Sequence, residues 1–140
     1  GEGSWCYVPD KGKLISEAVR LIKKGGTIAF TDWMEGEGLT DKEADRAMGF
    51  LKFPSLCTPA EYKGMLEKNA CKILCAEDTG VLPKYADLYA EMLTSQHKYD
   101  ALRCLGFDPA ALDTFTEEFL FVQKLIHKGK IIQGRVIAVK

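Results

Sequence analysis

Residues 10–33 read DKGKLISEAVRLIKKGGTIAFTDW, and this stretch decides the fold class. Apolar side chains recur at helical spacing after Asp10, which stands at the N-cap position, and a Gly-Gly pair ends the expected helix. The nearly uniformly apolar run 27–33 follows at once and predicts a strand covered on both faces, as in parallel α/β sheets. A helix, a tight turn and a buried strand in this order indicate an α/β fold.

The rest of the chain continues the alternation of helices and strands. Caps, proline starts and apolar runs predict helices that begin after Thr40, Thr58, Pro83 and Asp108, and strands at 71–76 and 131–139. Gly134 inside the last strand predicts a bulge or a close backbone approach. We expect one domain that spans residues 1–140.

The strand at 27–33 raises a problem of pairing. A central strand needs neighbours on both edges, yet residues 1–9 (GEGSWCYVP) look like a loop that leaves an absent strand, and nothing upstream is expected to pair with the outer edge. An apolar strand with an open edge tends to recruit another chain. The sequence therefore predicts self-association through the strand 27–33.

Composition narrows the classes of partner. The 19 basic and 20 acidic residues are interspersed and give a net charge of −1, which offers no basic stripe for nucleic acid and no polybasic run for a membrane. The five cysteines form no CxxC pair and have no histidine nearby at zinc-ligand spacing; they are Cys6, Cys57, Cys71, Cys75 and Cys104. We expect reduced, mostly buried thiols, no metal, and a cytoplasmic location.

Three stretches carry a resemblance to a known family. The run 10–33, the segment FPSLCTPAEYKGMLEKNACKILCAEDTG at 53–80 and the terminal IIQGRVIAVK resemble the second half of class I S-adenosylmethionine-dependent methyltransferases. The similarity is greatest to the sarcosine and dimethylglycine N-methyltransferases, with ubiquinone-type C-methyltransferases more distant. It implies a partial Rossmann-like sheet, with equivalents of strands 5, 6 and 7 and flanking helices, and without the first half of the fold.

The same resemblance bears on the cofactor. Members of the family hold S-adenosylmethionine mainly on their first half, through a glycine-rich turn and an acidic residue, and no such fingerprint occurs here. Gly36 and Gly38 follow the strand 27–33, but their acidic neighbours favour a flexible loop over a cofactor cradle. We expect this chain alone to bind S-adenosylmethionine weakly or not at all.

Five residues are implied as site residues by the resemblance. Gly1 and Glu2 align with a loop that passes the methionine part of the cofactor, although these residues could also be left over from an expression vector. Tyr7 stands where many relatives have a histidine, which puts a general base here in doubt; it could orient an acceptor or simply pack. Asp32 could attract a cationic amine and Trp33 could hold a methylated ammonium, or the two could cap a turn and fill the core.

Other candidates are expected to be structural. His97 and His127 lack partners at ligand spacing, and the set Tyr85, Tyr89, Met92 and Tyr99 at helical spacing favours core packing over an acceptor lid. The resulting hypothesis is a truncated methyltransferase-like domain, derived from an enzyme for a small amine or amino acid, that is inactive alone. The alternatives are a non-enzymatic homodimeric remnant that binds a small ligand, or one subunit of a split methyltransferase with a complementing N-terminal half.

Overall fold

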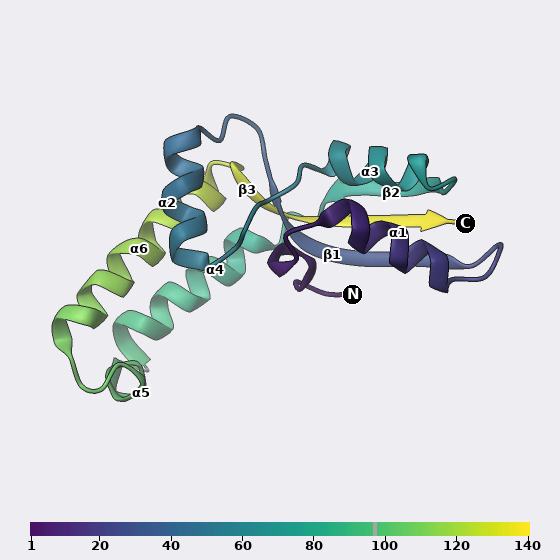
Figure 1. Ribbon diagram of the computed structural model, residues 1–140. Coiled ribbons are helices and arrows are strands. Elements are labelled where there is room, and N and C mark those ends of the chain that lie inside the picture. Colours follow the sequence, from purple (N-terminus) through teal and green to yellow (C-terminus); the bar gives the residue numbers. More distant parts are fainter. Residues whose placement is uncertain (97) are drawn as a thin grey trace.

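The computed structural model describes residues 1–96 and 98–140, so the prediction for His97 lies outside the described residues. Figure 1 shows the elements in the order η1 (Trp5–Tyr7), α1 (Lys11–Leu21), β1 (Thr27–Glu35), α2 (Asp41–Leu51), α3 (Pro59–Lys68), β2 (Lys72–Asp78), α4 (Leu82–Glu91), the π-helical turn η2 (Met92–Gln96), α5 (Lys98–Cys104), α6 (Pro109–His127) and β3 (Ile131–Val139). The sheet with α1 and α3 forms one end of the molecule, and α2, α4, α5 and α6 form the other.

Helix starts follow the predicted caps. The Asp10 side chain accepts a hydrogen bond from the Lys13 backbone nitrogen, and Asp108 caps α6 in the same way. Thr40 and Thr58 each form a complete capping box with the glutamate three residues on. The helical stretch after Pro83 is not continuous, because the π-helical turn η2 separates α4 from α5.

Among the described residues, three strands form one sheet in the order β1-β3-β2. The central strand β3 is antiparallel to both neighbours, so β1 and β2 run parallel to each other. Gly134 allows a close approach, because a Cβ there would lie 2.1 Å from the Met34 sulfur. The β1–β3 register is continuous past Gly134, and the irregularity falls instead in β2, between Ile73 and Cys75.

The prediction that the strand 27–33 is covered on both faces is wrong. Ile28, Phe30 and Met34 are buried, whereas Thr27 and Ala29 on the opposite face are exposed. The reason is that α1 and α3 lie over one face of the sheet (Figure 1). The other helices, α2, α4, α5 and α6, form a second helical layer that meets only the carboxyl end of β1. Over its first half β1 is therefore a half-buried strand.

The second helical layer has its own apolar core. Side chains from α2, α4 and α6 pack with Ile131 at the start of β3: Ala47, Leu82, Ala86, Val122, Leu125 and Ile126. Trp33 packs against this cluster, and its strand neighbours Phe30 and Met34 belong to the core under α1 and α3. The carboxyl end of β1 thus lies where the two cores meet.

The outer edge of β1 is partly paired, which corrects the expectation that nothing upstream can reach it. The Gly1 nitrogen donates to the Ala29 carbonyl at 3.1 Å, Thr31 N donates to Gly1 O at 3.1 Å, and Gly3 N donates to Thr31 O at 2.8 Å. This alternation is that of a parallel ladder, and Glu2 and Thr31 form a parallel bridge. Residues 1–3 therefore run beside β1 in the same direction.

Gly36 also differs from expectation. Its nitrogen donates to the Lys130 carbonyl at 2.9 Å, and a Cβ at this position would lie 1.9 Å from the Gly129 carbonyl oxygen. The first residue after β1 is thus packed against the turn between α6 and β3, rather than forming part of a flexible loop. Gly38, with φ of +72°, takes the left-handed conformation that glycine favours.

An ion pair joins α2 to the turn before β3 and predicts a response to pH. Lys130 Nζ donates to both Glu43 oxygens at 2.8 and 2.7 Å, and these bonds, with the Thr40 N–H bond, lower the Glu43 pKa from 4.5 to about 2. The pair stabilises the fold above pH 4.5, and this contribution is lost as the pH falls from 4.5 towards 2. Urea midpoints measured between about pH 2 and 5 should fall less steeply for Glu43→Gln than for the wild type; equal slopes would contradict the assignment.

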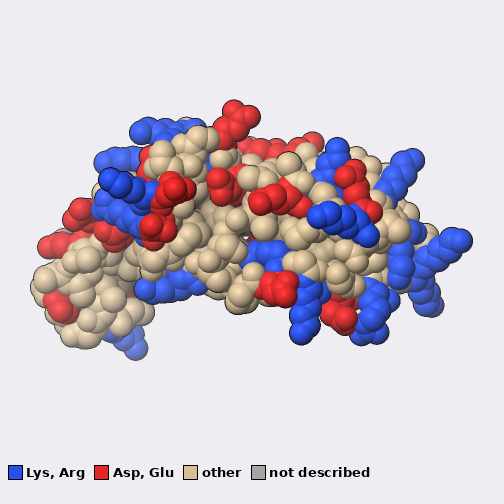
Figure 2. All heavy atoms as spheres, turned by 45° about the horizontal axis from the view of Figure 1, so that its top comes forward, with Lys and Arg blue, Asp and Glu red and all other residues tan. Residues whose placement is uncertain are grey.

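Acidic and basic side chains are interspersed on the face of the molecule that Figure 2 shows. No helix of the described residues is long and apolar enough to cross a membrane.

Candidate acceptor site at the end of strand β1

Three segments meet at the carboxyl end of β1: the short helix η1, the last residues of β1, and the loop between α2 and α3. Ligands of open α/β sheets gather at such strand ends. Glu35 N donates to the Cys57 carbonyl at 3.0 Å, which fixes the loop to the strand. Three of the five residues singled out from the sequence lie on these segments: Tyr7 in η1, and Asp32 and Trp33 in β1.

Asp32 lies inside the protein with none of its surface exposed. One carboxylate oxygen accepts from the Cys6 backbone nitrogen at 3.0 Å, and the other accepts from the Tyr62 hydroxyl at 2.8 Å. A buried carboxylate needs such donors to offset its lost hydration. Asp32 therefore ties η1 and α3 to the strand, and its oxygens face protein groups rather than solvent.

The Asp32 charge affects the two groups that it contacts. Burial, followed by the Asp32 charge, raises the pKa of the Tyr62 hydroxyl far above its usual value. Burial and Asp32 also raise the pKa of the Cys6 thiol from 9.0 to about 12, although Lys11 acts in the opposite direction. Both groups stay protonated at neutral pH, so neither acts as a nucleophile or base here.

This protonation makes Cys6 unreactive. Cys6 is fully buried and holds almost no thiolate at about pH 8, whereas Cys104 is exposed. Iodoacetamide at about pH 8 should alkylate Cys104 rapidly and leave Cys6 unmodified until the protein is unfolded in urea, as followed by peptide mass spectrometry. Equal rates at the two residues in the native protein would contradict this placement.

Three aromatic rings form a row at this end of the strand. The Phe53 ring contacts both of the others: its centroid is 4.9 Å from that of Tyr7 and 5.7 Å from that of Trp33, both in edge-to-face contact. Phe53 is buried, Trp33 is half-buried, and Tyr7 is 57% exposed. The row thus presents aromatic surface to solvent at its Tyr7 end, on a buried base.

Phe53 was missed as a site residue. It begins the segment 53–80, but it follows α2 in a loop, and a single phenylalanine there reads as ordinary core. The sequence signal for the placement of Phe53 is the Phe-Pro step just after the helix. Proline constrains the residue before it to extended conformations, so the chain leaves the helix at Phe53. Contact with Tyr7 and Trp33 comes only from the tertiary fold.

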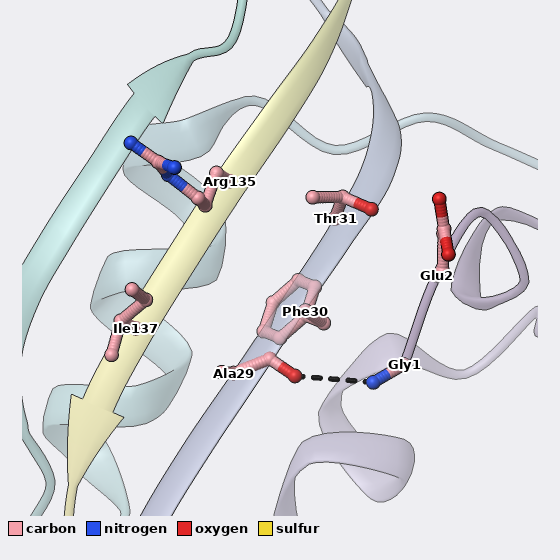
Figure 3. Close-up of a pocket in the computed structure, with 7 residues that line it drawn as sticks. All are labelled: Gly1, Glu2, Ala29, Phe30, Thr31, Arg135 and Ile137. Carbon is pink, nitrogen blue, oxygen red and sulfur yellow. Dashed lines mark hydrogen bonds between the residues drawn. The ribbon is translucent and has the colours of Figure 1, made fainter.

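Gly1 and Glu2 lie elsewhere, at an open hollow of about 350 Å³ on the edge and uncovered face of the sheet. Figure 3 shows them across β1 from Arg135 and Ile137, with Thr31 between. Tyr7, Asp32 and Trp33 do not line this hollow. The structure therefore brings Tyr7 and Trp33 together through Phe53, and keeps Gly1 and Glu2 apart from them.

The tyrosines of the second layer are exposed, which corrects the expectation of core packing. Tyr85, Tyr89 and Tyr99 are 56, 58 and 67% exposed. For Tyr85 and Tyr89 the reason is that α4 turns its Leu82 and Ala86 side towards the core, whereas Tyr99 lies in α5. His127 lies on the surface and contacts Asp87 at 2.6 Å, and in the described part of the chain no three His, Cys, Asp or Glu side chains are grouped to hold a metal ion.

Comparison with known proteins bears on the fold of this chain. No protein-family model matches the chain. A dimethylglycine N-methyltransferase from Parasynechococcus marenigrum (strain WH8102) is 28% identical over 97 residues, which cover 69% of this chain and 30% of that protein. A solved structure assigned as a sarcosine dimethylglycine methyltransferase from Galdieria sulphuraria superposes on 99% of the chain with a TM-score of 0.83 and 16% identity. The chain has the fold of part of a class I S-adenosylmethionine-dependent methyltransferase.

A further solved methyltransferase extends the agreement. The phosphoethanolamine N-methyltransferase 2 of Haemonchus contortus, in complex with phosphomonomethylethanolamine and S-adenosylhomocysteine, superposes on 99% of the chain with a TM-score of 0.79 and 18% identity. This chain spans 51% of the Galdieria methyltransferase and 32% of the Haemonchus methyltransferase. The predicted partial methyltransferase fold is thereby confirmed.

Proposed function

We propose that this chain forms the acceptor-binding half of an S-adenosylmethionine-dependent N-methyltransferase that acts on a small amine or amino acid. The observation that carries the proposal is the aromatic row of Tyr7, Phe53 and Trp33 at the carboxyl end of β1, on a methyltransferase fold. The similarity to a dimethylglycine N-methyltransferase supports the class of acceptor.

The aromatic row suits an amine that carries methyl groups. Ring faces attract cations, and contact with a methylated ammonium contributes about 0.5–2 kcal/mol. Tyr7 is exposed, and its hydroxyl can donate a hydrogen bond to the methyl acceptor or accept one from it. These side chains orient an acceptor; methyl transfer needs such alignment more than it needs a catalytic nucleophile.

The described residues do not fit a complete cofactor site. The hollow beside Gly1 and Glu2 is open, and the Arg135 guanidinium that lines it already pairs with Glu77. S-adenosylmethionine, when bound, supplies the methyl group, and we propose that a first half of the fold supplies most of its contacts. That half belongs either to the same polypeptide or to a separate subunit.

The edge of β1 indicates where this first half would dock. Residues 1–3 run parallel to β1 at Thr31, and the face around Ala29 and Ile137 is uncovered by the described residues. We propose that a parallel strand continues this ladder along Thr27–Ala29, with helices over the uncovered face. A second copy of this chain, paired through the same edge, is the competing occupant.

The acceptor assignment is tested in a chimera that joins the first half of the Galdieria methyltransferase to this chain. With tritiated S-adenosylmethionine, we expect label to pass to sarcosine or dimethylglycine. Trp33→Leu should raise the KM for the amine about tenfold with little change in kcat, and Tyr85→Leu, a change at an exposed aromatic outside the row, should leave both unchanged. A chimera that binds S-adenosylhomocysteine yet transfers no label to amines would contradict the proposed acceptor.

A further inference from the structure

Two buried charged side chains, Lys11 and Asp32, bind the backbone of the same residue, Cys6. Among the described residues, Lys11 (5% exposed) and Asp32 (0%) are the charged side chains in the interior. Asp32 Oδ1 accepts from the Cys6 nitrogen at 3.0 Å, and Lys11 Nζ donates to the Cys6 carbonyl at 3.3 Å. The Asp32 carboxylate therefore binds the N–H of Cys6, and the Lys11 ammonium group binds its carbonyl.

Lys11 uses its remaining donors on two further carbonyls. Its Nζ donates to Val8 O at 2.6 Å and to Ser55 O at 3.3 Å. Three acceptors match the three N–H donors of an ammonium group, and all three are backbone oxygens. Because Ser55 is 44 residues from Lys11, this side chain joins the η1 segment to the loop between α2 and α3.

These contacts lie next to two rings of the aromatic row, Tyr7 and Phe53. Tyr7 lies between Cys6 and Val8, whose carbonyls Lys11 holds, and Phe53 lies two residues before Ser55. The Lys11 ammonium group thus joins the two segments whose rings make the 4.9 Å contact between Tyr7 and Phe53. Tyr7 is itself exposed, so little packing of its own holds it there.

The two buried charges have opposite signs and act on the same thiols. A buried charge without a counter-charge is strongly unfavourable, and removal of one partner leaves the other uncompensated. Lys11 and Asp32 act on the same neighbours with opposite signs, since Asp32 raises the pKa of Cys6 and of Cys57 and Lys11 lowers both. The two groups therefore share one buried environment.

We propose that Lys11 and Asp32 are a coupled pair of positioning residues. Together they hold Tyr7 against Phe53 at the exposed, Tyr7 end of the aromatic row. The coupling is a property of the fold, and its use in acceptor binding rests on the proposed function. In this assignment Asp32 acts through the backbone of Cys6 rather than by contact with the acceptor.

The coupling is tested by a double-mutant cycle on residues 1–140. Lys11→Met and Asp32→Asn should each lower the folding equilibrium constant about 100- to 1,000-fold, because each strands a buried charge. The double variant should be at least about tenfold more stable than the product of the two effects predicts. Lys13→Met, at an exposed position in the same helix, is the matched control and should change the constant less than about threefold. Additive effects would overturn the proposal; if Lys11→Met does not fold, Lys11→Gln completes the cycle.

Positioning is tested by hydrogen exchange and by a cation probe. The variant is Lys11→Met, or Lys11→Gln if that one is used in the cycle. Its amide exchange rate at residues 6–8 should rise at least about tenfold, while β1 and β3 keep their protection. An exchange rate that rises throughout the protein would show a merely structural role and overturn the proposal. Tetramethylammonium, titrated against Trp fluorescence, should bind the wild type at least about five times more tightly than the variant, and equal affinities would overturn the positioning role. A wild type that does not bind this cation counts against the proposed function, whereas the exchange and the cycle still decide the coupling.

Discussion

Gly36→Ala should lower the free energy of unfolding by about 3 kcal/mol, because the added methyl group has no room. Its Cβ would lie 1.9 Å from the Gly129 carbonyl oxygen and 3.2 Å from Ile132 Cγ2. The obstacle is backbone rather than a flexible side chain, and the Gly36 N–H bond to Lys130 O prevents the two segments from separating without loss. Urea unfolding followed by Trp fluorescence measures the change.

The control for this prediction is another glycine in the same part of the chain. Gly49 lies inside α2, and a methyl group added there would have nothing within 4 Å, so Gly49→Ala should raise stability by about 0.5–1 kcal/mol through helix propensity alone. A loss below about 1 kcal/mol for Gly36→Ala would contradict the close contact between the end of β1 and the turn before β3.

Phe30→Ala should cost about 3–5 kcal/mol, since it removes the ring at the centre of the core under α1 and α3. Phe30 is 3% exposed, stacks on Trp5 at 3.9 Å between centroids, and contacts Tyr62 edge-on at 5.1 Å. Its loss leaves a cavity under both helices and frees the Trp5 ring beside Gly1.

The matched change is at an exposed ring. Tyr85 is 56% exposed, so Tyr85→Ala should alter the free energy of unfolding by less than about 0.5 kcal/mol. Differential scanning calorimetry should therefore show a large fall in Tm for Phe30→Ala and almost none for Tyr85→Ala. Similar shifts in Tm would mean that the core is not centred on Phe30.

Local signals in the sequence predicted the elements well. Asp10, Thr40, Thr58 and Asp108 all cap helices, and the last strand has the predicted bounds. A cap is recognisable because its side chain bonds to an N–H only two or three residues on, so the sequence window contains the whole interaction. The antiparallel direction of the last strand has no such local signal.

The faces of the elements were harder to predict. The run 27–33 is apolar on both sides of the strand, yet only one side is covered over its first half, because coverage depends on where distant helices pack. The tyrosines of α4 have helical spacing, but the Leu82 and Ala86 side of that helix is the buried one. Periodicity shows that a helix has an apolar stripe without showing which of two stripes meets the core.

The surroundings of the candidate site residues could not be predicted from the sequence. Asp32 and Trp33 lie at the end of β1, as expected, but Asp32 is bonded to Cys6 and Tyr62 inside the protein, and Trp33 reaches Tyr7 only through Phe53. These partners lie 20 to 46 residues away in the sequence, so no local pattern links them. The role of Lys11 was likewise hidden, because a lysine at a helix start reads as a solvated charge.

The central claim is that this chain binds the methyl acceptor, while a first half of the fold makes most contacts to the cofactor. Isothermal titration of residues 1–140 with S-adenosylhomocysteine tests this claim most directly. We predict no binding tighter than about 1 mM for the chain alone, and micromolar binding for the chimera that supplies a first half. Micromolar binding by residues 1–140 alone would contradict this division of the site.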